Sequence, residues 1–362
     1  QYEIPAGLII CDARFWRVRA VKTGEPGPWS ESRSVEIAVS SSPKLIGQLD
    51  SSDGFTGNPI GMAIKGNYAI VGHTSGVDQM SVVNISDPGN PTLVTTFEHS
   101  PGQKPKLTGD YLYCYVDGGT EESIIKVDVS DPENPVQVGN PCSLKFDPGL
   151  GSGTLDYNAN IYLDNSGGGS GLLVAVYDQD TPTSAGIMQI DFSDHFTPVV
   201  DGMFMTTDDQ PFAIEQAATT GLVSIRGEGV QSFSLIGQDV SDSYGIENMG
   251  FGHIEIGGNY AFVSNMDGPL TILDISNPSS LSLVYTYDPG EGTGPSTVFG
   301  NYLFTGLATS QKFTILDIRD PSAPVLVSEG NMGWIATVIG NYAYGVEWTT
   351  GKFTIWDLLP ED

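Results

Sequence analysis

Residues 300–324 read GNYLFTGLATSQKFTILDIRDPSAP, and near copies of this stretch recur along the chain. Each copy has three marks: a Gly-Asn-Tyr triplet, an apolar run that ends in Asp or Asn plus one more apolar residue, and a turn bracketed by proline. Self-similarity at a period of roughly 20–50 residues is typical of repeat architectures. The copies therefore decide the fold class.

The three marks predict an alternation of strands and turns. A Gly-Asn or Gly-Asp pair between apolar runs predicts a two-residue hairpin, because both residues tolerate the positive φ that a primed turn needs. Asp or Asn before Pro starts a turn through its side chain, while Pro ends the ladder of the preceding strand. Each unit therefore predicts four strands, joined by a tight turn, a loop and a proline turn.

The spacing of the units predicts a β-propeller. Tyr68 and Tyr111 are 43 residues apart, Tyr260 and Tyr302 are 42 apart, and Tyr302 and Tyr342 are 40 apart. A four-stranded unit of about 40–45 residues has the length of a propeller blade. Tyr111 and Tyr260 are 149 residues apart, which fits three stretched steps, with a third unit over residues 171–198 and a degenerate fourth unit whose middle strands lie over residues 221–236. We therefore expect an all-β, seven-bladed propeller over residues 41–362.

The two ends of the predicted ring complement each other. The last unit stops at Leu358 and lacks a fourth strand. Residues 43–49, in contrast, match the start of a fourth strand, but no first, second or third strand of a unit precedes them. We predict that residues 43–49 pair with residues 352–358 as the outer strand of the seventh blade. Such closure protects strand edges that would otherwise pair with other chains.

Two of the apolar runs carry a family resemblance. Leu316-Asp317-Ile318 and Leu273-Asp274-Ile275 resemble the signature of the LVIVD-repeat family, which forms predicted propellers in bacterial and archaeal surface proteins. The resemblance covers roughly residues 43–358, and the fourth unit departs from it. It implies a propeller fold and an extracellular or cell-surface location, and it supplies no catalytic residues.

Residues 1–40 differ from the repeats. Residues 14–21 alternate as a strand, residues 23–30 are rich in turn formers, and residues 34–39 indicate a second strand. The Trp-Arg-Val-Arg-Ala run from Trp16 and the Gly-Pro-Trp-Ser stretch that ends at Ser30 resemble the closing strands of a fibronectin type III domain. Because two strands are marginal alone in water, an upstream segment or another chain is expected to complete them. The predicted domains are residues 1–40 and 41–362, with Ser40–Ser42 as linker.

The charge of the chain excludes some partners. The chain has 15 basic and 44 acidic residues, a net charge of −29. Residues 1–40 hold five of each sign, so the imbalance lies in the propeller. An acidic surface repels nucleic acid and anionic membranes, and no apolar run approaches the ~18 residues of a membrane helix. We expect neither nucleic-acid binding nor membrane insertion. Because the first residue is Gln1 and not Met, we expect a processed chain or a piece of a longer one.

The residues that usually carry chemistry are few and scattered. None of the four histidines (His73, His99, His195 and His253) has metal-ligand spacing. His73, His99 and His253 could meet on the loop face, the side of the ring that carries the loops between second and third strands and the stretches that enter the next unit. Asp156 begins a calcium-like segment, but Ile161 and Gly167 stand where a calcium loop needs Gly and Glu. The paired carboxylates Glu121-Glu122 and Asp208-Asp209 are expected by chance in so acidic a chain. We expect no cofactor, no metal and no catalytic residue.

The cysteines leave one alternative open. Three cysteines are too few for a disulfide framework. Cys114 lies in an apolar run and is expected in the core. A bridge between Cys114 and Cys142 is the alternative, although it would join strands that are not adjacent.

Two tryptophans are the candidate ligand-binding residues. Trp334 and Trp348 both belong to the loop-face end of the seventh unit. Exposed aromatic side chains on such a face are a common device for binding sugars or proteins. The alternative is that they pack at the seam between blades, since Trp is usually well buried. The longest stretch between units, residues 140–157, is the other candidate on this face.

These observations predict a non-catalytic binding or structural module of an extracellular, cell-surface or virion protein. The propeller would be the C-terminal tip of a longer modular or assembled protein and would bind a protein or a glycan, which suits adhesion. One alternative is an enzyme that acts on polysaccharide through the loop face. The other is an architectural subunit of a homo-oligomer or fibre.

Overall fold

The structure is a computed structural model. It describes residues 39–360 apart from 75–78, 99–102, 117–122, 144–160, 165–170, 178–184, 193, 195–197, 208, 218, 236–238 and 332, together with four short strands between residues 14 and 35. Among these residues the one helical element is the 3-10 turn η1 (Ser51–Asp53). No described helix is long and apolar enough to cross a lipid bilayer.

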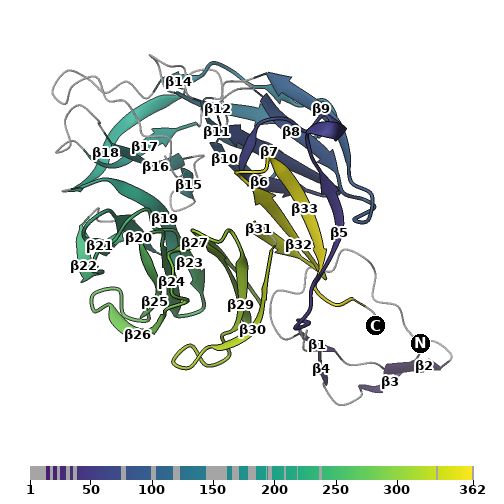
Figure 1. The fold of residues 1–362 in the computed structure, drawn as a ribbon. Coiled ribbons are helices and arrows are strands. Elements are labelled where there is room, and N and C mark those ends of the chain that lie inside the picture. The colour runs from purple at the N-terminus through teal and green to yellow at the C-terminus, as the bar shows by residue number, and fades with distance from the viewer. Residues whose placement is uncertain are drawn as a thin grey trace.

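Antiparallel sheets follow one another around a ring, with the first strand of each sheet nearest the centre (Figure 1). Six of them have four strands. In order from the innermost strand they are β6 (Asn58–Lys65), β7 (Tyr68–Thr74), β8 (Gln79–Asn84) and β9 (Thr92–Glu98); β15 (Ile161–Asp164), β16 (Gly171–Tyr177), β17 (Ala185–Asp191) and β18 (Val199–Thr207); β19 (Pro211–Ala217), β20 (Thr220–Ile225), β21 (Gly229–Ser234) and β22 (Val240–Gly245); β23 (Ile254–Gly257), β24 (Tyr260–Asn265), β25 (Gly268–Asp274) and β26 (Ser282–Tyr287); β27 (Thr293–Phe299), β28 (Tyr302–Leu307), β29 (Phe313–Asp317) and β30 (Val325–Gly330); and β31 (Trp334–Ile339), β32 (Tyr342–Glu347), β33 (Lys352–Asp357) and β5 (Lys44–Leu49).

The remaining sheet of the ring has five strands. It contains β10 (Gln103–Thr108), β11 (Tyr111–Val116), β12 (Ser123–Asp128), and two short pieces that both pair with β12, β13 (Val136–Gln137) and β14 (Cys142–Ser143). Its outer edge is divided because Gly139 has a φ of 72° and Pro141 has no N–H to donate. The all-β propeller is as predicted. The prediction of a seven-bladed propeller is wrong: the ring has six four-stranded blades, and this sheet is not one of them.

The predicted closure of the ring is confirmed. Strand β5 pairs antiparallel with β33, and Lys44 lies opposite Asp357. Next to this pair, the Ser40 amide donates to the carbonyl oxygen of Leu358 at 2.8 Å. Val39 is buried in a cluster that contains Leu358. The segment that leads into the ring is therefore fixed against its last strand.

The strand directions define two faces of the ring. Hairpins between first and second strands, and proline turns between third and fourth strands, lie on one side, which we call the turn face. Connections between second and third strands, and the stretches that lead into the next sheet, lie on the other side, which we call the loop face. Because β33 ends and β5 begins on the turn face, residues 39–41 dock on the turn face.

The repeated residues build the turn face. The glycines of the Gly-Asn or Gly-Asp pairs have φ between 57° and 62°, as their hairpins require; they are Gly66, Gly109, Gly258, Gly300 and Gly340. In the quoted unit, the Asp317 carboxylate accepts from the Arg319 amide at 3.0 Å, and the Ile318 amide donates to the Asn301 carbonyl at 2.8 Å. Asp320 caps its proline turn by accepting from the Ser322 amide at 3.0 Å. The repeated residues therefore form the turns of this face.

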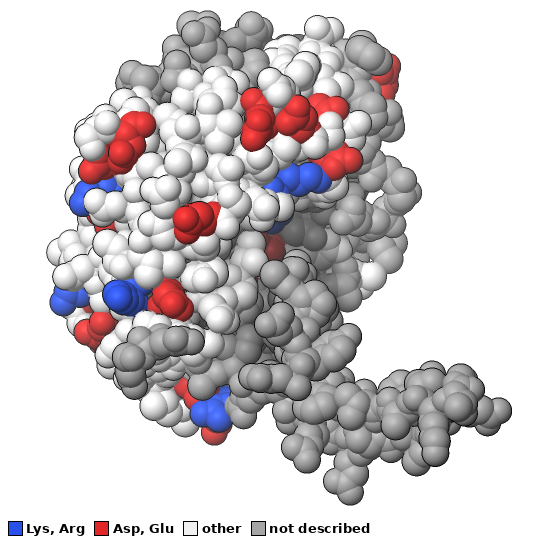
Figure 2. All heavy atoms as spheres, turned by 90° about the vertical axis from the view of Figure 1, so that its right-hand side faces the viewer, with Lys and Arg blue, Asp and Glu red and all other residues white. Residues whose placement is uncertain are grey.

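The hydrophobic core lies between neighbouring sheets. One cluster joins Val71 and Val83 of the sheet β6–β9 to Phe353 and Ile355 of the closing sheet. Another joins Ala213 and Leu222 to sheet β23–β26. Each sheet is thus stabilised by burial against both of its neighbours. The surface is acidic, and Figure 2 shows separate groups of Asp and Glu, with few Lys or Arg, on the side that faces right in Figure 1.

Four short strands precede the ring. They are β1 (Arg14–Trp16), β2 (Arg19–Lys22), β3 (Glu25–Trp29) and β4 (Arg33–Val35), and they pair antiparallel as β1 with β4 and β2 with β3. The expected loop over residues 23–30 is therefore largely strand, with Lys22 opposite Glu25 at the reversal. The boundary between the predicted domains stays a prediction.

Candidate functional site

Trp334 lies at a seam between two sheets. It is the first residue of β31 and is partly buried. A Cβ placed on Gly306 would come within 2.6 Å of Trp334 Cδ1, and one placed on Gly294 within 3.3 Å of its Nε1. The indole ring therefore covers the backbone of β27 and β28, and glycine is needed beneath it. Its buried N–H has no hydrogen-bond partner among the described residues.

Trp348 lies on the exposed rim of the loop face. Its side chain is 45% exposed, in the turn between β32 and β33. The Gly351 amide donates to the Glu347 carbonyl at 2.9 Å and closes this turn. The Thr349 hydroxyl donates to the Gln311 side-chain oxygen in the neighbouring sheet. The turn therefore presents an aromatic ring from a fixed support. Of the two predicted tryptophans, Trp348 is the more exposed.

The loop face also carries an aromatic cluster that the sequence reasoning missed. Phe212 lies 4.9 Å from Phe251 and 5.2 Å from His253, measured between ring centroids. The Arg226 guanidinium lies 5.3 Å from the Phe251 ring. Phe212 is buried, Phe251 and His253 are partly exposed, and Arg226 is exposed. We call Phe212, Arg226, Phe251 and His253 the loop-face aromatic cluster.

Backbone contacts hold this cluster between two sheets. The Arg226 amide donates to the Gln210 carbonyl at 2.9 Å, and the Gly227 amide donates to the Met249 carbonyl at 2.8 Å. A guanidinium stacked on an aromatic ring can contact a planar, polar or anionic group of a ligand. None of these residues belongs to the repeated marks, so the repeat alignment did not point to them. The sequence nonetheless contains a sign of this cluster: the fourth unit departs from the repeat pattern, and Arg226 directly follows the second strand of that unit.

The histidines do not form a common site in the described structure. His73 is fully buried in β7, where its Nε2 lies 2.9 Å from the Ser81 hydroxyl and its ring lies 5.0 Å from Phe55. Burial lowers the pKa of His73 to about 4. His253 belongs to the loop-face aromatic cluster, in another sheet. His99 and His195 lie outside the described residues.

Three ionisable side chains lie at the same register position on the innermost strands of three sheets. Lys106, Glu215 and Glu255 lie opposite Tyr113, Leu222 and Phe262, which is the same register position in their three sheets. We call Lys106, Glu215 and Glu255 the inner polar layer. Innermost strands surround the central channel of a propeller, so the three residues of this layer lie on the strands nearest that channel. The signal in the sequence was positional, since Lys106 and Glu255 each stand three residues before a turn glycine.

The inner polar layer contains coupled carboxyl groups. One Glu255 carboxylate oxygen accepts from the Val298 amide of the next sheet at 3.1 Å. Burial raises the pKa of Glu255 to about 7, and the nearby Glu215 carboxylate adds to the rise. Burial also raises the pKa of Glu215, and Lys106 opposes the rise for both residues. The layer can therefore hold a proton near neutral pH.

The remaining predicted candidates are structural or lie elsewhere. Cys114 and Cys142 are free, buried thiols, so the bridge considered as an alternative is not formed. Burial raises the pKa of Cys142 to about 11. Within the described part of the chain, no group of three or more His, Cys, Asp or Glu side chains is placed to hold a metal ion. The calcium-like segment at residues 156–160, Glu121-Glu122 and Asp208 lie outside the described residues.

Comparison with known proteins identifies the repeat. The chain matches the LVIVD repeat at residues 56–98, 252–289 and 297–331. It therefore carries LVIVD repeats in a β-propeller arrangement, as the resemblance implied. No curated protein matches the chain.

Solved structures share the fold at low sequence identity. The Pan2 WD40 domain of Neurospora crassa has a TM-score of 0.64 at 12% identity, over 91% of this chain and 99% of that one. The Cps50 (Swd1) β-propeller domain of Myceliophteria thermophila has a TM-score of 0.62 at 12% identity, over 88% and 100%. BamB from Moraxella catarrhalis has a TM-score of 0.52 at 14% identity, over 82% and 84%. At such identities the likeness shows the fold alone.

Proposed function

We propose that this chain is a non-catalytic binding module of an extracellular, cell-surface or virion protein, and that its loop face binds a protein or a glycan on another surface. One observation carries the proposal: the segment before the ring is fixed to the turn face, through the Ser40 amide and the Leu358 carbonyl. The loop face is the opposite end of the ring. A module attached in this way directs its loop face toward a partner.

The chemistry of the loop face supports the same function. Trp348 and the loop-face aromatic cluster place exposed or partly exposed rings and a guanidinium on this face. Trp and Arg are enriched among the residues that dominate binding energies. In so acidic a chain, an exposed arginine held on an aromatic ring offers a local positive group for a polar or anionic partner.

Residues 14–35 support a modular setting. Their two antiparallel pairs, β1 with β4 and β2 with β3, are compatible with the closing strands of a fibronectin type III-like domain. We propose that an upstream segment or another chain completes that domain. This arrangement would join the turn face to the rest of a longer or assembled protein.

The test is a binding screen with three loop-face variants and one arginine variant on the turn face as the control. The purified chain is screened against immobilised glycans and extracts of cell surfaces, and each hit is repeated with Arg226→Ala, Phe251→Ala and Trp348→Ala. We expect at least one of these changes to weaken binding by about 2 kcal/mol, the size of a hot-spot effect. Arg319→Ala, on the turn face, is the control and should bind as the original chain does. Binding that survives all three loop-face changes would overturn the proposal.

Polysaccharide hydrolysis is the second candidate, and the inner polar layer favours it. A glycosidase needs one carboxyl group that holds a proton and a second that is ionised. Burial raises the pKa of Glu255 to about 7, so this group can hold the proton, and Glu215 supplies a second carboxyl group in the same layer. The test is release of reducing ends from the glycans that bind. Turnover that disappears in a folded Glu255→Gln variant would support hydrolysis, and no turnover would exclude it for those glycans.

A further inference from the structure

The tyrosine of the repeat is missing from the third unit, where Gly171 stands opposite Asp191, and from the fourth unit. Five units begin their second strand with tyrosine: Tyr68, Tyr111, Tyr260, Tyr302 and Tyr342. In the fourth unit β20 begins with Thr220. The backbone confirms this alignment, because the Leu235 amide donates to the Thr219 carbonyl at 3.0 Å, as the Ile85 amide donates to the Asn67 carbonyl at 2.8 Å. Thr220 therefore occupies the position of Tyr68.

This tyrosine normally fills the seam between its own sheet and the next sheet of the ring, at the turn face. We number each seam by the unit whose second strand begins beside it. Tyr260 packs in one cluster with Val298 and Ile318 of the next sheet. Tyr342 packs in the same way with Ile64 and Ile85 across the ring closure. In both seams the tyrosine shares a cluster with one apolar residue from the end of the next innermost strand and one from the start of the next proline turn.

The hydroxyl group of the tyrosine can also form a hydrogen bond to the proline turn of the next sheet. At the first seam the Tyr68 hydroxyl donates to the Glu133 carboxylate at 2.5 Å. Glu133 follows Pro132 in the proline turn of the next sheet. The corresponding residue after Pro278 is Ser279, which would lie near the polar end of a ring in the fourth seam.

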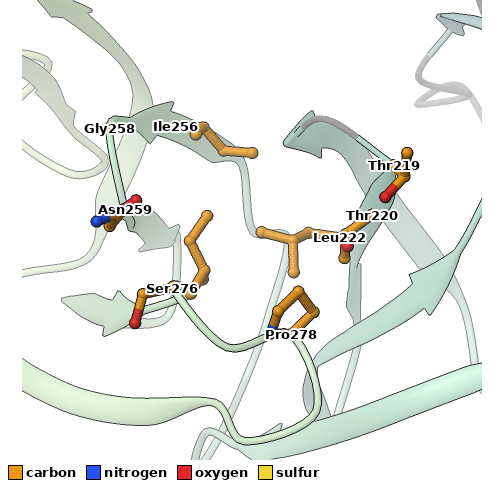
Figure 3. A pocket seen from close by; sticks show the side chains of 9 residues that line it. Thr219, Thr220, Leu222, Ile256, Gly258, Asn259, Ser276 and Pro278 are labelled. Carbon is orange, nitrogen blue, oxygen red and sulfur yellow. The ribbon is translucent and has the colours of Figure 1, made fainter.

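At the fourth seam there is a cavity where a tyrosine ring would be. Its volume is about 390 Å³. Leu222, Ile256 and Pro278 point toward the hollow, and Asn259 and Ser276 lie at its edge (Figure 3). Ile256 and Ile275 are the counterparts of Val298 and Ile318, the residues that share a cluster with Tyr260. The walls of the seam are thus retained while the side chain that fills it is absent.

We propose that this seam cavity, with Leu222, Ile256 and Pro278 as its apolar walls and Thr220, Asn259 and Ser276 as its polar groups, binds one phenol-sized aromatic ring. The apolar interior matches the faces of such a ring, and the hydroxyl and amide groups at the edge match a polar substituent. The volume lies within the range of about 300–1,000 Å³ that small-molecule sites have. Apolar cavities of about 150 Å³ already bind benzene.

The ring could belong to a free small molecule or to a tyrosine side chain presented by a peptide. Two probes distinguish these sources: p-cresol, and a tripeptide Gly-Tyr-Gly blocked at both ends. Binding is followed by NMR as saturable shifts of the chain's amide signals, with affinities expected in the millimolar range. Saturation by p-cresol alone indicates a free compound. Tighter saturation by the tripeptide indicates a presented side chain. Saturation by neither probe would overturn the proposal.

The decisive variant restores the residue of the repeat. Thr220→Tyr should abolish binding of both probes and raise the melting temperature, because the chain's own ring then fills the seam. Thr220→Val, which keeps the size of the side chain, should bind as before. Ile256→Phe narrows the cavity from the opposite wall and covers the case in which Thr220→Tyr does not fold. Binding that persists in a folded Thr220→Tyr or Ile256→Phe variant would overturn the proposal.

This site is independent of the proposed loop-face function. The seam cavity opens beside the hairpin and proline turns of the turn face, so changes at Arg226 or Trp348 should leave probe binding intact. Loss of loop-face binding and loss of probe binding are therefore separate outcomes.

Discussion

Phe353 in β33 lies opposite Leu49 in β5, and both side chains are almost completely buried. Nearly the whole propeller sequence separates these two residues, so their contact forms only when the ring is complete. The entropy cost of closing so long a loop must be met before the contacts of the closing strand stabilise the chain. The closing sheet is therefore the place where a small change should affect the stability of the whole ring.

Gly47 in β5 tests the ring closure. A Cβ at Gly47 would come within 2.2 Å of the Pro88 carbonyl oxygen and 2.8 Å of Pro91 Cδ, in the proline turn of the next sheet. Gly47→Ala should therefore lower the free energy of unfolding by about 1–3 kcal/mol, the usual cost of overpacking. Urea unfolding measures it. The neighbouring exposed change Gln48→Ala is the control and should stay within about 0.5 kcal/mol of the original chain. Equal effects of the two changes would contradict the tight contact.

His73 should make the propeller sensitive to acid. Its folded pKa of about 4 lies below the ordinary value of 6.5, so the unfolded chain binds more protons between these two values. Stability is then lost as the pH falls through this window, by about 3 kcal/mol. In His73→Gln this part of the acid dependence should disappear when unfolding is measured over the window. Ser81→Ala, which removes the partner but keeps the imidazole, should retain it. An unchanged pH dependence in His73→Gln would contradict the buried, neutral histidine.

Glu255 should make the propeller less stable as the pH rises, which is the opposite of the acid sensitivity expected from His73. Its pKa rises from 4.5 to about 7 on folding, so its contribution to stability is present below the unfolded pKa and is lost as the pH rises through the folded one. Glu255→Gln keeps an oxygen that can accept from the Val298 amide but cannot ionise. This variant should therefore gain stability relative to the original chain between about pH 5 and pH 8, by about 2 kcal/mol.

The control for Glu255 is an exposed carboxylate. Glu329→Gln changes the net charge equally but lies on the exposed side of β30. It should show no such gain when denaturant unfolding is compared at the two pH values. Glu215 and Lys106 share the layer with Glu255, so Lys106→Met should enlarge the loss of stability at high pH. A flat difference between Glu255→Gln and the original chain would refute the coupled layer.

The fold was largely predictable because its signals are local. A positive φ at Gly300 and a side-chain cap at Asp317 act within a few residues, so the turns of each repeat can be predicted from the residues of that repeat alone. The outer edge of sheet β10–β14 was missed because Gly139 and Pro141 interrupt a ladder whose start looks regular. Strand β3 was missed because Gly and Pro near Trp29 indicated a loop, yet these residues pair with β2.

The candidate site was less predictable because it depends on contacts between units. The exposure of Trp334 is decided by Gly294 and Gly306, which lie in another sheet and carry no mark of their own. Arg226 and Phe251 meet only when two sheets are packed side by side. Sequence patterns within one unit cannot report such contacts, whereas comparing the same position across all units can, as the inner polar layer shows.

The two tryptophans should separate stability from binding. Trp334→Ala removes a ring that covers two glycines, so it should lower the free energy of unfolding by about 3 kcal/mol, as large-to-small changes at packed positions do. Trp348→Ala removes an exposed ring and should change the stability by less than about 0.5 kcal/mol. Thermal and urea unfolding measure both. On any glycan or surface protein that binds the loop face, Trp348→Ala should weaken binding although the chain stays folded. If Trp334→Ala were as stable as the original chain, the seam packing described for its indole ring would be wrong.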